Sequence, residues 1–70
     1  MISERLQKLV EEMVDREVQF EDAVHEFEKR FIVRVLVRCE GSLTKTADAL
    51  GMHRNTLTRK MGDYKIKRRV

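Results

Sequence analysis

The sequence has no proline, no tryptophan, a single cysteine and only three glycines among its 70 residues. The lone Cys39 cannot form a disulfide within the chain, and no cluster of cysteine and histidine predicts a structural zinc site. No apolar run approaches the roughly 20 residues that cross a bilayer, and no signal-peptide pattern opens the chain. We therefore expect a highly charged, helical protein of a reducing cytoplasm.

Residues that could perform chemistry are equally scarce. Cys39 has no histidine or acid at the spacing that would make it a nucleophile, and nothing resembles a glycine-rich phosphate loop. Asp22 and His25, with two glutamates nearby, are far more typical of surface charge than of a metal site. We expect no enzymatic activity and no cofactor or metal.

The net charge of +3 is unevenly distributed along the chain. Residues 1–30 hold nine acids and five bases, a net charge of −4. Residues 31–40 hold one acid and two bases, for +1, whereas residues 41–70 hold two acids and eight bases, for +6. A basic surface gathered in one part of a chain is typical of nucleic-acid-binding proteins, although charge alone fits a solvated surface equally well.

Apolar residues at helical spacing predict a first helix over about residues 3–17, with Ser3 as its N-cap. Residues 17–20 are expected to interrupt it, although a single long helix remains an alternative. A second helix should then extend to residue 39 or 40 and end at Gly41. Its first half presents the predicted core stripe of Ala23, Val24, Phe27 and Phe31.

Residues 31–39 are almost wholly apolar, and only Arg34 and Arg38 interrupt them. A helix that is apolar nearly all round has to be buried nearly all round, which one chain of this size cannot achieve alone. We therefore expect a homodimer whose interface contains Phe31, Ile32, Val33, Leu36 and Val37. A β-strand over residues 33–39 is the alternative, but no second strand is available to pair with it.

Two short helices joined by a tight turn are predicted in the C-terminal half. The first should span about 43–50, between the N-cap Ser42 and the terminating Gly51. The second should span about 54–64, with His53 at or near its cap. Their apolar positions are Leu43, Ala47, Leu50, Leu57 and Met61. Such a pair is a helix-turn-helix, whose second helix usually enters the major groove of DNA.

The outward face of that second helix presents side chains suited to DNA bases, since arginine pairs with guanine and asparagine with adenine. The predicted base-reading residues are Arg54, Asn55, Thr58 and Arg59. Phosphates should pass on a flank of this helix and at the N-terminus of the preceding one. The predicted phosphate contacts are Ser42, Thr44, Lys45, His53, Thr56 and Lys60. Beyond the helix, Ile66 is expected to fold back onto the core, and residues 67–70 form a basic tail.

The stretch GSLTKTADALGMHRNTLTRKM, followed by Tyr64, resembles the DNA-binding domain of the bacterial Fis family. The pattern of that family is met by Gly41, Ser42, Ala47, Leu50, Gly51, Met52, Arg54, Thr56, Leu57, Lys60 and Met61. The resemblance covers about residues 20–66. It implies an all-α, four-helix domain that dimerises through its first two helices, within residues 1–40, and binds DNA through a helix-turn-helix at 41–66.

The resemblance also implies roles for single residues. Arg54 would read a base, with Asn55 and Arg59 near the bases, in successive major grooves of a roughly palindromic target. Thr44, Lys45, Thr56 and Lys60 would contact phosphates. At the cap of the second helix, where the family often has asparagine or serine, this chain has His53.

The predicted function is therefore sequence-preferring binding of double-stranded DNA, as a transcriptional regulator or a nucleoid-associated factor. The alternative is a small protein-interaction module that docks a partner through its acidic N-terminal helix. RNA binding is disfavoured because few aromatic residues are available to stack on unpaired bases.

Overall fold

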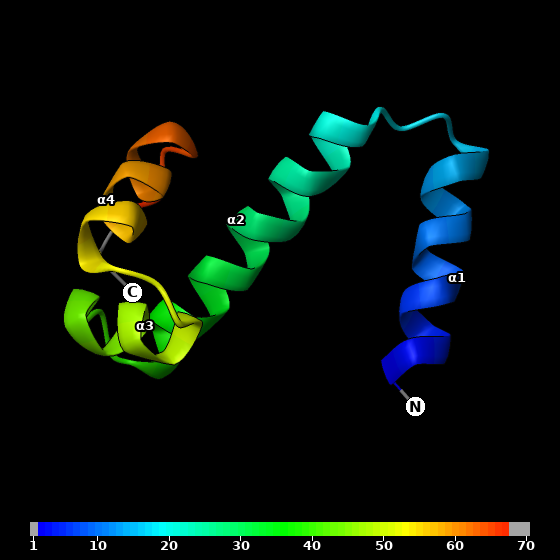
Figure 1. Ribbon diagram of the computed structural model, residues 1–70. Coiled ribbons are helices and arrows are strands. Elements are labelled where there is room, and N and C mark those ends of the chain that lie inside the picture. Colours follow the sequence, from blue (N-terminus) through cyan, green and yellow to red (C-terminus); the bar gives the residue numbers. More distant parts are fainter. Residues whose placement is uncertain (1, 68–70) are drawn as a thin grey trace.

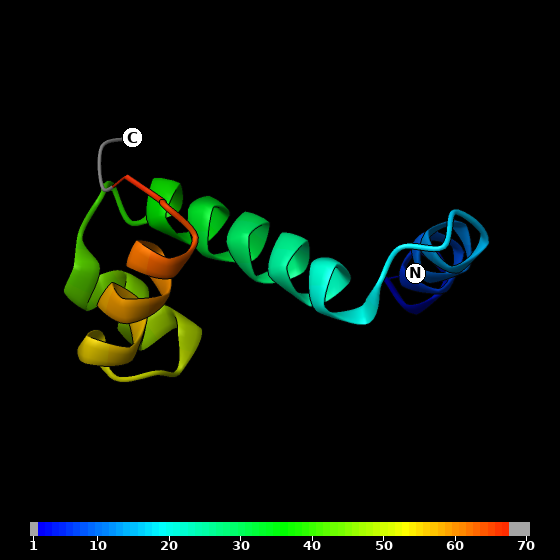
Figure 2. The same cartoon turned by 90° about the horizontal axis from the view of Figure 1, so that it is seen from above.

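The computed structural model describes residues 2–67 as four helices. They are α1 (Ile2–Asp15), α2 (Phe20–Arg38), α3 (Leu43–Leu50) and α4 (Arg54–Asp63). Helices α3 and α4 gather around the C-terminal half of α2, whereas α1 lies apart beyond its N-terminal end (Figure 1). The view from above shows the same separation (Figure 2). Most of the predicted basic tail, residues 68–70, lies outside the described residues.

The all-α fold class is confirmed, and the four helices fall close to their predicted positions. Residues 33–38 are helical, so the strand considered for this stretch is wrong. The predicted interruption near residues 17–20 is confirmed as well. Helix α1 begins at Ile2, so Ser3 lies in its first turn and does not cap it. Over the described residues 2–67, no helix is long and apolar enough to cross a membrane.

The hydrophobic core forms where α2 meets the helix-turn-helix. Its buried residues are Ile32, Leu36, Ala47, Leu57 and Met61, with Leu43, Leu50, Met52, Tyr64 and Ile66 packed against them. Ile66 thus folds back onto the core as predicted, and its N–H donates to the Met61 carbonyl at 2.8 Å. Every apolar position predicted within the helix-turn-helix takes part in this cluster. The core therefore fixes α3 and α4 against one side of α2.

The burial of α2 agrees with the prediction only in part, since three of the five predicted interface residues are exposed. Ile32 and Leu36 were expected at a dimer interface, but they are only 2% and 0% exposed because α3 and α4 of the same chain cover them. Phe27 and Phe31 were expected in a core stripe, yet they are 57% and 51% exposed. Phe31 and Ile32 are neighbours in sequence, and one helical residue turns the side chain by about 100°. The helix therefore buries one side and leaves the other uncovered.

Helix α1 contributes no buried residue to the core. Its apolar side faces α2 across an open groove of about 800 Å³. The apolar residues that line the groove are Leu6, Leu9, Val10, Met13, Ala23, Val24, Phe27 and Phe31. Leu9 and Val10 remain 51% and 45% exposed. An apolar surface of this kind on a small protein marks an interaction site.

Each of the four described helices ends in the same backbone pattern, the Schellman motif, in which a residue with positive φ follows the helix. The residues in this position are Glu17, Glu40, Gly51 and Lys65, with φ of 59°, 53°, 72° and 55°. At the end of α2, the Glu40 N–H donates to the Val37 carbonyl and the Gly41 N–H to the Leu36 carbonyl, both at 3.0 Å. Glu40 therefore takes the position that was predicted for Gly41, and Gly41 follows it with φ of 81°.

Glycine at position 40 should stabilise the protein. The left-handed conformation costs a residue with a Cβ about 1–2 kcal/mol, and glycine would remove that strain. Part of the gain is offset because glycine also increases the conformational entropy of the unfolded chain. We expect Glu40→Gly to raise the free energy of unfolding by about 0.5–1 kcal/mol in urea denaturation. Glu40→Gln keeps the Cβ and removes the charge, so it should leave stability nearly unchanged. A loss of stability in Glu40→Gly would contradict this account of the turn.

Candidate nucleic-acid interface

The start of α3 is fixed by Ser42. Its Oγ accepts a hydrogen bond from the Lys45 N–H at 3.2 Å, which makes Ser42 the N-cap that was predicted. Its carbonyl accepts from the Thr46 hydroxyl at 2.7 Å. Thr46 is fully buried, so this second bond ties the helix start to the core. Thr44 and Lys45 are left exposed in the first turn, where the positive end of the helix dipole favours an anion.

The turn between α3 and α4 is closed by Gly51 and by His53. Gly51 has the positive φ that its position requires, and the Met52 N–H returns to the Ala47 carbonyl at 3.0 Å. Met52 packs against the core and so anchors the middle of the turn. His53 is the N-cap of α4: its Nδ1 accepts from the Asn55 N–H at 3.1 Å. The prediction that His53 lies at this cap is confirmed.

The cap contact also determines where the ring of His53 holds its proton. A nitrogen that accepts a hydrogen bond has no proton, so the neutral ring holds its proton on Nε2. The side chain is exposed. His53 can therefore cap α4 through one nitrogen while the other donates a hydrogen bond outward. An asparagine or serine at this position would cap the helix with a shorter side chain and reach less far.

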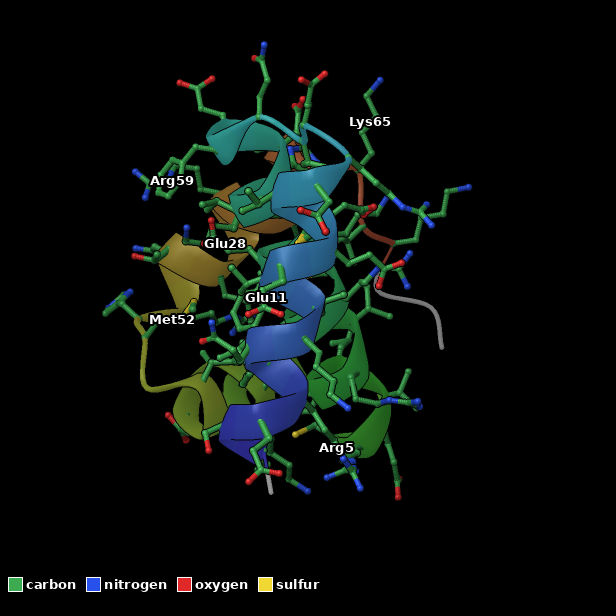
Figure 3. The ribbon with its side chains drawn as sticks, turned by 90° about the vertical axis from the view of Figure 1, so that its right-hand side faces the viewer. Arg5, Glu11, Glu28, Met52, Arg59 and Lys65 are labelled. Atoms are coloured by element: carbon green, nitrogen blue, oxygen red, sulfur yellow. The ribbon has the colours of Figure 1, made fainter. Side chains whose placement is uncertain are left out.

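Helix α4 divides into an inner and an outer face. Leu57 and Met61, at 0% and 7% exposed, hold the inner face against the core. The outer face presents the four predicted base-reading residues, Arg54, Asn55, Thr58 and Arg59, all of which are exposed. The Thr58 hydroxyl donates to the Arg54 carbonyl at 3.0 Å, and Arg59 extends into solvent (Figure 3). The structure thus brings together two guanidinium groups, an amide and a hydroxyl on one exposed helical surface.

Lys60 is in a different position from the other bases of α4. Its Nζ donates to Glu28 Oε1 at 2.6 Å, and the two side chains are only 27% and 29% exposed. The second oxygen of the same carboxylate, Oε2, accepts from the Tyr64 hydroxyl at 2.7 Å. We call these three residues the Glu28 cluster. The phosphate contact predicted for Lys60 has not been tested, but its ammonium already has a partner in α2.

The hydrogen bonds of the Glu28 cluster shift the ionisation of all three members. The bond from Lys60 is the largest cause of a lowered pKa for Glu28, and the bond from Tyr64 acts in the same direction. The pKa of Lys60 is raised, chiefly because the bond to Glu28 stabilises its charged form. The pKa of Tyr64 is raised because its hydroxyl donates to the carboxylate. At neutral pH the cluster therefore holds a charged carboxylate, a charged ammonium and a neutral phenol.

The Glu28 cluster was not predicted from the sequence. Glu28 is one of the two glutamates near Asp22 and His25 that were interpreted as surface charge. His25 does take part, since its ring lies 4.4 Å from that of Tyr64, centroid to centroid. Among the residues the structure describes, no three His, Cys, Asp or Glu side chains are grouped as metal ligands would be. A signal was nevertheless present: Glu28, Ile32 and Leu36 recur every four residues, which puts a charge on a buried stripe.

Comparison with known proteins agrees with this geometry. Residues 23–64 match the sequence pattern of a family described as "Bacterial regulatory protein, Fis family". A curated protein of Xylella fastidiosa (strain 9a5c), whose name describes it as Fis-like and DNA-binding, is 44% identical over 41 residues. Those residues are 59% of this chain and 46% of that protein, so the chain spans about half the length of this relative. No solved structure matches the chain significantly.

The Glu28 cluster predicts a defined pH dependence of stability. Because the pKa of Glu28 is lowered from 4.5, its stabilising effect is present above about pH 4.5 and is lost as the pH falls through the folded value. Because the pKa of Lys60 is raised from 10.5, its effect is present below that pH and is lost only at higher pH. Wild type should therefore exceed Glu28→Gln by about 1 kcal/mol in free energy of unfolding between about pH 5 and 9.

That difference should shrink as the pH falls below about 4.5 and vanish once the pH is below the lowered pKa of folded Glu28, in urea denaturation at one fixed protein concentration. Glu12→Gln is the matched control, because it removes a carboxylate from the exposed pair with Arg16 at 3.3 Å. We expect it to change stability by less than about 0.5 kcal/mol at any pH. A Glu28→Gln difference that persists unchanged into acid would show that the charge of Glu28 is not what stabilises the cluster.

Proposed function

This chain belongs to the Fis family of bacterial regulatory proteins, and on that basis we propose that it binds double-stranded DNA as a homodimer. We further propose that it acts as a transcriptional regulator or a nucleoid-associated factor. The observation that supports DNA binding best is the outer face of α4, where Arg54, Asn55, Thr58 and Arg59 are exposed together. Its opposite face packs into the core through Leu57 and Met61.

The proposed contacts separate into base-reading and positioning groups. Arg54, Asn55, Thr58 and Arg59 would meet base edges in the major groove, because their side chains offer the donors and acceptors that distinguish base pairs. Ser42, Thr44, Lys45, His53 and Thr56 would meet phosphates on either side. Phosphate contacts of this kind fix the register of a protein on the duplex, and base contacts give it a sequence preference. We leave Lys60 out of the phosphate group because Glu28 already holds its ammonium.

The proposed homodimer follows from the groove between α1 and α2. Phe27 and Phe31 on α2 and the apolar side of α1 are partly or largely exposed in a single chain. A second copy related by a two-fold axis would bring the same apolar surfaces to the groove, since such an interface is formed by one patch on both subunits. Val33 and Val37, at 36% and 43% exposed, continue the uncovered surface along α2. The two α4 helices would then read a roughly palindromic site.

DNA binding should be strongly salt-dependent. With three or four phosphates neutralised per subunit, log K should fall with log salt at a slope of about −5 to −7. We expect fluorescence anisotropy on a labelled duplex to show this slope.

Arg54→Ala should weaken binding by about 1–3 kcal/mol and relax the sequence preference. Lys8→Ala removes a base from the polar side of α1 and should change neither the affinity for DNA nor the sequence preference. Binding that is undetectable or independent of salt would refute the proposal.

Dimerisation can be measured separately from DNA binding. Light scattering should give about twice the 8.3 kDa mass of the chain at micromolar concentration. Leu6→Glu places a charge in the apolar groove and should shift the protein towards the monomer. Gln7→Glu introduces the same residue one position later, outside the groove lining, and should leave the mass unchanged. A folded wild-type monomer at these concentrations would show that the groove serves something other than a second copy.

A further inference from the structure

Glu28 lies at the junction between the two proposed surfaces of α2. It occupies the side that faces the helix-turn-helix, one turn before the buried Ile32. Its neighbour Phe27 points to the other side and lines the groove beside α1. A contact made by Glu28 therefore connects the reading helix to the part of α2 that the proposed dimer would hold.

The contact that Glu28 makes is directional. One carboxylate oxygen accepts from Lys60 at 2.6 Å and the other from Tyr64 at 2.7 Å. Lys60 lies in the last turn of α4 and Tyr64 is its C-cap, four residues further on, so the two side chains lie one above the other. Two bonds from one carboxylate to successive turns restrain both rotation of α4 about its axis and sliding along α2. The ring of Tyr64, packed 4.4 Å from that of His25, adds a third point of contact with α2.

The apolar core cannot supply the same restraint. Hydrophobic attraction is non-directional, and within residues 2–67 only five apolar side chains are buried in this core. An ion pair that is still partly exposed, such as that of Lys60 and Glu28, adds only modest stability, and exchange of a buried pair for apolar residues is often neutral. Such a pair is well suited to select one packing of α4 against α2 among several of similar energy. Geometry, more than stability, is what the Glu28 cluster adds.

We propose that Glu28 is a positioning residue, which sets the distance and angle between the two recognition helices of the dimer by fixing α4 against α2. The proposal rests on the DNA-binding homodimer described above. In a two-fold dimer, a change in the angle between α2 and α4 occurs in both subunits. Each subunit displaces its own α4, so the change in the separation of the two α4 helices is doubled. Half-site spacing on DNA reports that separation, because successive major grooves recur every 10–10.5 base pairs, about one turn.

The test is selection from a random-sequence duplex library that spans at least three helical turns, with the full chain as the binding protein. Wild type should enrich two half-sites at one dominant spacing. Glu28→Gln should enrich the same half-site bases, because α4 retains its base-reading residues, but over several neighbouring spacings. Its affinity for the wild-type spacing should fall by about tenfold. Glu12→Gln, the same change in an exposed pair at the C-terminal end of α1, should reproduce the wild-type spacing.

Each outcome has a distinct meaning. If wild type enriches no sequence, the proposed DNA-binding function fails, and this inference fails with it. If wild type and Glu28→Gln enrich the same single spacing, only the positioning role is refuted, even where affinity is lower. If circular dichroism shows that Glu28→Gln does not fold, Tyr64→Phe replaces it. Tyr64→Phe keeps the ring against His25 and removes only the hydroxyl, and it too should broaden the spacing. An unchanged spacing in that variant refutes the role.

Lys60→Met separates positioning from phosphate binding. If Lys60 acts through Glu28, this variant should broaden the half-site spacing and leave the salt dependence of binding unchanged. A phosphate ligand behaves differently: its loss would weaken all spacings alike and reduce the salt slope by about one per subunit. Lys45→Met, at the exposed start of α3, is the comparison for that second behaviour. A Lys60→Met variant that matches Lys45→Met in both measurements would overturn the proposal.

Discussion

The apolar character of both sides of α2 is the constraint on which the rest of the structure depends. A chain of 70 residues has too little surface to cover a 19-residue helix on two sides. Helices α3 and α4 cover the side of Ile32 and Leu36 and complete the core. The side of Phe27 and Phe31 stays open and, with α1, forms an apolar groove. The proposed reading and self-association surfaces are therefore opposite sides of one continuous helix.

The helix-turn-helix could be predicted almost residue by residue because its determinants are local. Ser42 caps α3 through an N–H three residues away, and His53 caps α4 through an N–H two residues away. Gly51 supplies the positive φ that ends α3. Each of these rules connects a residue to its near neighbours, so the sequence alone was sufficient. The exposed face proposed to read bases followed from the same periodicity, since the apolar positions of α4 define its inner side and leave Arg54 and Arg59 outside.

The parts that could not be predicted depend on contacts between distant segments. Periodicity showed that both sides of α2 were apolar, but it could not show which side α3 and α4 would cover, so Ile32 and Leu36 were assigned to the interface and Phe27 to the core. Gly41 was chosen as the helix terminator on residue preference, whereas the hydrogen bonds place Glu40 there. The partner of Glu28 lies 32 residues further along the chain, beyond the reach of any local pattern. A charge on a buried stripe predicts that a partner exists without showing which residue it is.

The Glu28 cluster also changes what the basic charge of the helix-turn-helix means. The sequence places eight bases in residues 41–70, and each adds to the field that attracts a polyanion. Affinity through released counterions, however, comes only from cations that can leave their present partners and reach a phosphate. Lys60 is held at 2.6 Å by a carboxylate of another helix, so its charge is compensated within the protein. Exposed bases such as Lys45 and Arg59 keep that freedom. A fixed lysine and a free one count equally in net charge, yet in the proposed complex the first would define where α4 lies and the second how strongly the surface attracts DNA.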